Sequence, residues 1–144
     1  KHHGHGQKGL PIIKALCERL RIPNEFRDLA LIVSDQHQNV HQAFKLRPET
    51  IIKIFDKADF WRKPERLKQL VQACIADMRG RTGFEHQDYP QGEYFSQCFA
   101  VASNVNIKAI IQAGFKGEEI KQILHMHRID AVGQLKRDKQ NAVD

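Results

Sequence analysis

The sequence predicts an all-α protein of about seven helices, and three observations lead to this fold class. No segment alternates apolar and polar residues with the period of two that a half-buried strand requires. Apolar residues instead recur at three- and four-residue spacing, as they do on one face of a helix. Proline and glycine fall between these stretches, where helices begin and end. At 144 residues the chain can form one domain with a hydrophobic core, or one domain and a small appendage.

The first half of the chain divides into four predicted helices. The glycine- and histidine-rich residues 1–9 are expected to form a loop, after which a helix runs from about Pro11 to Arg21. A second and longer helix follows Asn24 and extends to about Phe44. Two more helices are predicted after it, at about 48–58 and 64–79.

The second half begins with a loop at Gly80–Gly92 and continues with three predicted helices. The first carries an apolar stripe made of Tyr94, Phe95, Cys98, Phe99 and Ala102. A short helix is expected between a cap at Asn106 and Gly114. The last helix starts near Gly117, and its residues after Lys136 are expected to fray.

Three polar residues interrupt the predicted apolar faces. His37 falls on the inward face of the second helix, between Val33 and Val40, and His41 follows one turn later. Asp77 falls on the inward stripe of the fourth helix, three residues after Cys74. A buried polar group without a partner costs about 1–3 kcal/mol, so this pattern indicates a site.

Histidines and a carboxylate from separate helices suit a divalent metal, and His5 in the first loop is a further candidate ligand. The spacing is weak evidence, because neither HExxH nor CxxC is present. His37 can also be a hydrogen-bonded core histidine, and Asp77 can simply pair with Arg79 or Arg81. No GxSxG motif and no GxxxxGK[ST] phosphate loop occurs in the chain.

The charge of the chain indicates what kind of partner it can bind, and its cysteines indicate the cellular compartment. The net charge is +6, and residues 45–81 hold ten basic and five acidic side chains. This excess suits a phosphate-bearing partner, although a solvated helix face explains it equally well. Cys17 and Cys74 lie among apolar residues and indicate reduced core cysteines of a cytoplasmic protein. No apolar run is long enough to span a membrane.

Five segments of the chain carry a resemblance to a known family. They are HGHGQKGLP, RLRIPNEFRDLALIVSDQHQNVHQAFKLRPETI, WRKPERLKQLVQACIADMRGRTGFE, YPQG and AGFKGEEI. Together they closely resemble the C-terminal portion of bacterial multifunctional CCA proteins, which are class II tRNA nucleotidyltransferases with an HD domain. The resemblance implies a parent enzyme that adds C, C and A to tRNA 3′ ends. It also implies HD-type phosphohydrolase activity of the 2′,3′-cyclic phosphodiesterase and phosphatase kinds.

The family's metal pattern can be carried onto this chain residue by residue. His5 resembles the histidine that follows the family's His-Asp doublet, with His2 or His3 as alternatives, and His37 resembles the next histidine. Asp77 resembles the distal aspartate, and His41 is expected to contact substrate or to support a metal ligand. The chain contains no His-Asp doublet, so we expect the doublet upstream of residue 1. The site for nickel, magnesium or manganese would then be incomplete in this chain. The chain alone is expected to be inactive, and no catalytic residue is assigned.

The resemblance also predicts domains and partners. Residues 1–80 are expected to be the C-terminal part of an HD domain, and residues 81–144 a loop and helical tail that contact tRNA. The nucleotides CTP and ATP would bind only the parent's missing head, no membrane is involved, and a homodimer is possible. The predicted RNA-binding residues are Arg62, Lys63, Arg66, Arg79 and Arg81. Two alternatives stay open: a stand-alone all-α RNA-binding module, and an HD phosphohydrolase unconnected with tRNA.

Overall fold

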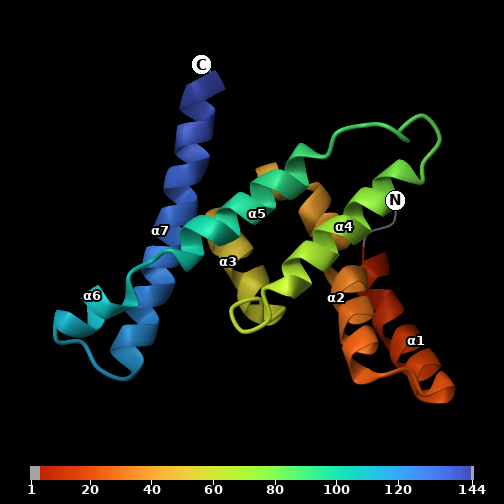
Figure 1. The fold of residues 1–144 in the computed structure, drawn as a ribbon, viewed down its shortest axis with the longest axis horizontal. Helices are drawn as coiled ribbons and strands as arrows, with labels where there is room; N and C mark the ends of the chain where they lie inside the picture. Colours follow the sequence, from red (N-terminus) through yellow and green to blue (C-terminus); the bar gives the residue numbers. More distant parts are fainter. Residues whose placement is uncertain (1–3, 144) are drawn as a thin grey trace.

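The computed structural model describes residues 4–143, except for the side chain of His5, and these residues are helical with no strand (Figure 1). The predicted all-α class and the expected seven helices are confirmed. The helices are α1 (His5–Leu20), α2 (Asn24–His41), α3 (Pro48–Lys57), α4 (Glu65–Arg79), α5 (Pro90–Ser103), α6 (Ile107–Gln112) and α7 (Glu118–Val143), with a short 3-10 helix η1 (Ala43–Lys45) after α2.

The helix α1 begins at His5, so the prediction that residues 5–9 form a loop is wrong. The glycines serve close packing here. A Cβ atom on Gly6 would overlap the carbonyl oxygen of Ser34, and one on Gly9 would come within 2.9 Å of the Ser34 hydroxyl oxygen. That hydroxyl donates to the carbonyl of Gly6 at 2.7 Å. Glycine therefore lets α1 lie against α2, which is why a glycine-rich segment is helical.

The hydrophobic core lies between α3, α4, α5 and α7. Phe55 and Phe95 are fully buried with ring centroids 5.1 Å apart. Phe55 also makes ring contacts with Phe60 and Phe99. The core cluster extends from Val40 to Val132 and so joins residues on both sides of position 80. The domain division predicted there stays a prediction.

The long helix α7 crosses this core and carries α6 at its first turns (Figure 1). Val132 is fully buried, and the Lys136 ammonium donates to the carbonyl of Leu46 at 3.0 Å. The helix continues to Val143, so the predicted fraying after Lys136 is wrong. The predicted cap of α6 is confirmed, since the Asn106 side chain accepts a hydrogen bond from the amide of Ala109 at 3.0 Å.

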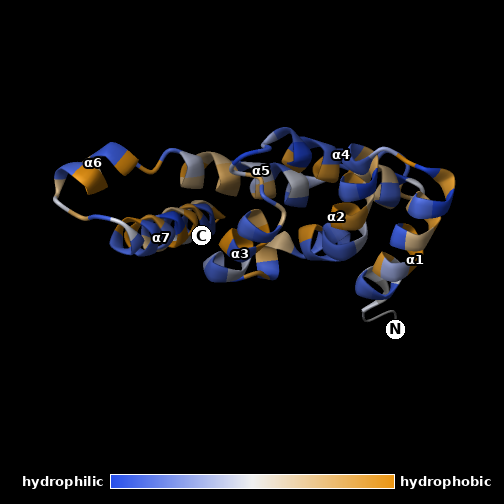
Figure 2. Cartoon of the chain, turned by 90° about the horizontal axis from the view of Figure 1, so that it is seen from below, coloured by the Kyte–Doolittle hydropathy of each residue, from blue (hydrophilic) through white to orange (hydrophobic). Residues whose placement is uncertain are grey.

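The molecule is elongated, with α6 and the start of α7 at one end, α1 at the other, and α3 and α5 between them (Figure 2). The helix α2 ends at His41, earlier than predicted, and η1 follows. Phe26 and Phe44 continue the apolar spacing of this segment, but Phe26 in the first turn of α2 is 62% exposed and Phe44 in η1 is 47% exposed. No helix among residues 4–143 is long and apolar enough to cross a membrane.

Candidate functional site

The packing of α4 on α2 brings His37, His41 and Asp77 together, as their positions on the two helices predicted. The Nε2 atom of His41 lies 2.9 Å from a carboxylate oxygen of Asp77. The imidazole rings of His37 and His41 meet edge to face, with centroids 6.1 Å apart. Both histidines are half-buried. The two histidines of α2 and the aspartate of α4 therefore belong to one cluster.

The ring of His37 is held by its own helix. Its Nδ1 atom lies 2.8 Å from the carbonyl oxygen of Val33, one turn earlier. A carbonyl only accepts hydrogen bonds, so Nδ1 carries the proton and the lone pair of a neutral ring lies on Nε2. A backbone carbonyl that fixes Nδ1–H in this way is a common partner of metal-binding histidines, which then bind through Nε2.

His41 is held from both sides. A carboxylate only accepts, so the Nε2–H of His41 donates to Asp77. On the other side, the Tyr89 hydroxyl lies 2.7 Å from Nδ1. Burial, followed by the nearby Cys74, raises the pKa of Tyr89, so the phenol keeps its proton and donates to Nδ1. Both nitrogens are thus engaged, which suits a supporting contact to Asp77 better than direct metal binding.

Sequence reasoning missed Tyr89. It stands at the end of an irregular loop, just before α5, where no periodicity marks it. The residue type and its position could have indicated its role. A tyrosine next to Pro90 at a helix start is well placed to be buried with its hydroxyl hydrogen-bonded. It is 8% exposed in the structure.

Asp77 does not face the core, and that prediction is wrong. Its side chain is 43% exposed and lies 3.7 Å from the guanidinium of Arg81. The stripe of α4 is buried at Leu67, Leu70 and Cys74, but the helix emerges from the packed region near its C-terminus. Burial would raise the pKa of Asp77, but the hydrogen bond from His41 and the charge of Arg81 outweigh it and lower the pKa.

A cavity of about 470 Å³ lies beside this cluster, between α1, α2 and α4. His37 and Asp77 line it together with Ser34, and the remaining wall is apolar. Its size falls within the range of small-molecule sites. A polar pair at the edge of an apolar cavity is an arrangement that can orient a ligand.

The residues described here do not make up a metal centre by themselves. Among residues 4–143, no three histidine, cysteine, aspartate or glutamate side chains are grouped to hold a metal ion. The side chain of the predicted ligand His5 lies outside the described part, as do His2 and His3. His37 and Asp77 share a cavity, so they are two candidate donors of an incomplete set, and the predicted metal stays a prediction.

The five predicted RNA-binding residues fall into two groups at opposite ends of α4. Arg62, Lys63 and Arg66 lie at its N-terminal end, and Arg79 and Arg81 at its C-terminal end. The inner members, Arg66 and Arg79, are thirteen positions apart along the helix, a rise of about 20 Å. A single short phosphate contact therefore cannot engage both groups, whereas an extended polyanion can.

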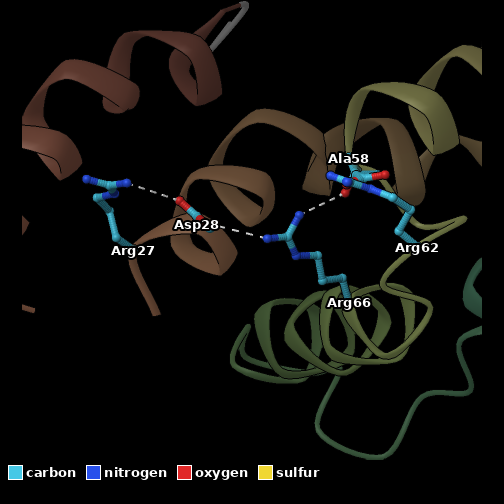
Figure 3. A network of polar contacts seen from close by, with 6 residues as sticks. Arg27, Asp28, Ala58, Arg62 and Arg66 are labelled. Carbon is cyan, nitrogen blue, oxygen red and sulfur yellow. Dashed lines mark hydrogen bonds and ion pairs between the residues drawn. The ribbon is translucent and has the colours of Figure 1, made fainter. Parts of the chain in front are cut away.

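The N-terminal group contains one arginine with a structural role (Figure 3). The Arg66 side chain is only 16% exposed, and its guanidinium contacts Asp28 at 3.6 Å and donates to the carbonyl of Ala58 at 3.2 Å. Arg62 is 80% exposed and donates twice to Asp59, at 2.8 and 2.6 Å. Arg62 and Lys63 are therefore the accessible members of this group.

The C-terminal group flanks the loop after α4. The Nε atom of Arg79 donates to the carbonyl of Gln87 at 3.4 Å, and Arg81 is 68% exposed beside Asp77. Arg81 thus links the predicted RNA surface to the histidine cluster. A phosphate near Asp77 would have this guanidinium within reach.

Comparison with known proteins finds a relative for nearly the whole chain. The chain is 60% identical over 136 residues to a Multifunctional CCA protein of Shewanella frigidimarina (strain NCIMB 400). The match covers 94% of this chain and 33% of the relative, so the chain spans about a third of the relative's length. No protein-family model matches the chain, and no solved structure gives a significant match. The predicted resemblance to the C-terminal portion of a bacterial multifunctional CCA protein is therefore confirmed.

Proposed function

We propose that this chain acts as part of a CCA-adding tRNA nucleotidyltransferase, to which it contributes a tRNA-binding surface and part of an HD-type phosphohydrolase site. The observation that supports this most is the 60% identity to a Multifunctional CCA protein over 94% of the chain. In this proposal the selection of CTP and ATP belongs to parts of the enzyme outside the matched third. The parent matures and repairs tRNA 3′ ends.

The phosphohydrolase part of the proposal rests on His37 and Asp77. They line one cavity, and the fixed proton on Nδ1 of His37 directs the ring's lone pair through Nε2. A divalent metal at such a site supplies charge that polarises a phosphate and activates water. The set needs further donors, for which His5 is the first candidate, and the chain alone is expected not to hydrolyse 2′,3′-cyclic nucleotides.

Calorimetric titration of the chain with nickel, manganese and magnesium tests this site. We expect binding that His37→Ala and Asp77→Asn abolish, whereas His127→Ala, an exposed histidine on α7, serves as the matched control and leaves it unchanged. Binding that survives His37→Ala would remove the site. No binding to the chain, with binding to a full-length CCA protein, would mean that the remaining donors are indispensable.

The tRNA part of the proposal rests on the basic residues at the two ends of α4. Contacts there would be made to phosphates and to RNA shape, since exposed lysine and arginine side chains pair well with phosphate oxygens. We expect the double variant Arg62→Gln/Lys63→Gln to weaken tRNA binding and to lower the salt slope of log K by up to about 2. The double variant Lys8→Gln/Lys14→Gln removes the same charge from exposed positions of α1 and is the control.

These measurements also separate the two alternatives. A stand-alone RNA-binding module predicts salt-dependent tRNA binding with no effect of His37→Ala or of chelators. If the chain belongs to a phosphohydrolase unconnected with tRNA, it should bind metal. The unsubstituted chain and Arg62→Gln/Lys63→Gln should then bind tRNA with the same weak affinity.

A further inference from the structure

A second cavity, of about 510 Å³, lies between η1, α5 and the last turns of α7, and it shares no lining residue with the His37 cavity. Two aromatic rings, two lysines and two amides line it: Phe44, Tyr94, Lys136, Lys139, Gln140 and Asn141. None of the proposed RNA-binding or metal-binding residues takes part. The proposed function therefore leaves this cavity without a role.

The aromatic wall of the cavity is a stack with an open outer side. The rings of Phe44 and Tyr94 are nearly parallel, with centroids 4.8 Å apart and an interplanar angle of 23°. Tyr94 is 2% exposed, whereas Phe44 is 47% exposed. Phe44 is thus the outer ring of the stack, and a further flat ring can stack on its exposed part. Exposed aromatic rings of this kind hold nucleobases in proteins that bind single strands.

The other wall is positively charged. One N–H of the Lys136 ammonium donates to the carbonyl of Leu46, and two N–H groups are left for other acceptors. Lys139 follows three residues later on the same helix and lines the cavity with it. No acidic side chain lines the cavity among the described residues, and the nearby Asp138 accepts a hydrogen bond from Gln134 at 2.8 Å. Two lysines without an acidic partner in the cavity suit a phosphate.

The inner ring of the stack, Tyr94, also carries a buried hydroxyl. The hydroxyl of Tyr94 is buried and has no hydrogen bond of good geometry in the described structure. Its neighbour is the Cys98 thiol, which is a weak hydrogen-bonding group. This contact directs the hydroxyl toward Cys98, so the ring of the stack that is left open is Phe44.

We propose that this cavity binds a nucleoside phosphate whose base is unstacked, with the base on Phe44 and the phosphate at Lys136 and Lys139. The nucleotide can be an unpaired residue of an RNA strand or a free nucleotide, since both present the same flat ring and phosphate. The site rests on residues of η1, α5 and α7 and is independent of the α4 surface and of the His37 cavity.

Tryptophan fluorescence tests the stacking directly. In Phe44→Trp the new indole takes the place of the outer ring, and in Phe115→Trp, the matched control, it replaces an exposed phenylalanine between α6 and α7. We expect AMP and a short oligoadenylate to quench the fluorescence of the Phe44→Trp protein and to leave that of Phe115→Trp unchanged. Quenching by AMP alone identifies a free nucleotide as the occupant, and equal behaviour of the two variants overturns the proposal.

Affinity measurements test the two walls separately. Phe44→Ala is expected to weaken oligoadenylate binding by about tenfold, the loss of one base–aromatic stack. AMP should bind more tightly than adenosine by about threefold, and Lys139→Gln should remove that difference. Unchanged affinity in Phe44→Ala overturns the proposal even where tRNA binding responds to Arg62→Gln/Lys63→Gln, so its failure is distinct from failure of the proposed function.

Discussion

The centre of the molecule and its N-terminal helix contain similar apolar patterns but use them differently. In the centre, Phe55, Phe60 and Phe95 are fully buried among α3, α5 and α7. In α1, Ile12 is 70% and Leu20 57% exposed, and Cys17 is the buried apolar side chain of that helix. The α1–α2 pair is held by close backbone packing at Gly6, and the centre by aromatic rings. Helical periodicity thus identifies a face, but only neighbouring elements decide whether it is buried.

The largest effect is expected in the centre. Phe55→Ala removes a ring that contacts four other aromatic rings and leaves a cavity, which costs about 3–5 kcal/mol of the free energy of unfolding. Urea denaturation followed by circular dichroism measures it. Phe26→Ala removes the same atoms from an exposed site and should change the free energy by less than about 0.5 kcal/mol. Equal losses in the two variants would contradict the contrast between the regions.

A smaller and more local effect is expected at the contact between α1 and α2. Gly6→Ala forces a methyl group onto the Ser34 carbonyl, so the helices must separate, at a cost of about 1–3 kcal/mol. Hydrogen exchange should accelerate in α1 while α5 stays protected. Gln7→Ala, at the exposed neighbouring position, should leave exchange unchanged. Uniform acceleration across α1 and α5 would show that the two regions unfold as one unit.

Arg66 connects the two regions, and its loss should cost less again. Its guanidinium joins Asp28 of α2 to the carbonyl of Ala58, directly after α3 (Figure 3), so Arg66→Ala is expected to lower the free energy of unfolding by about 1–2 kcal/mol. Arg62→Ala removes an exposed guanidinium from the same helix end and should leave the denaturation midpoint where it was. A larger loss of unfolding free energy in Arg62→Ala than in Arg66→Ala would show that Arg66 does not connect the two regions.

Thiol reactivity gives the finest comparison. Burial raises the pKa of Cys74 to about 12 and that of Cys98 to about 11, so both thiols stay protonated and unreactive at pH 8. Cys17 lies in the α1–α2 pair and becomes accessible when α1 opens locally. Alkylation followed by mass spectrometry should modify Cys17 first. Raising the pH should accelerate the alkylation of Cys74 and Cys98 only as the pH approaches their raised pKa values. Simultaneous alkylation of all three cysteines would contradict the prediction that Cys17 reacts first.

The sequence predicted the helices well wherever tertiary contacts agree with local signals. Pro48 at a helix start, the Asn106 cap and the stripe of Tyr94, Phe95 and Cys98 all lie where expected. The first glycines failed as loop signals, because flexibility and close packing both require glycine and the sequence does not distinguish them. Only the position of Ser34 on the facing helix decides between the two.

The candidate site was predicted in part. His37, His41 and Asp77 do come together, because their helical registers place them on facing sides of α2 and α4. The exposure of Asp77 was not predictable from register, since it depends on where α4 leaves the packed region. Tyr89 was not predictable either, because a loop has no period that locates its side chains. The metal set stays a prediction, because the side chain of the further candidate donor His5 lies outside the described part of the chain.

The hydrogen bond from Lys136 to Leu46 joins residues 90 positions apart, whereas the bond from Ser34 to Gly6 spans only 28. On a ribosome, the α1–α2 hairpin can therefore close while most of the chain is still being made. The aromatic centre cannot, because Val132 is one of its fully buried members and emerges late. Synthesis thus leaves the rings of α3 and α5 uncovered until α7 arrives, and the less buried end of the molecule is the one that can assemble first.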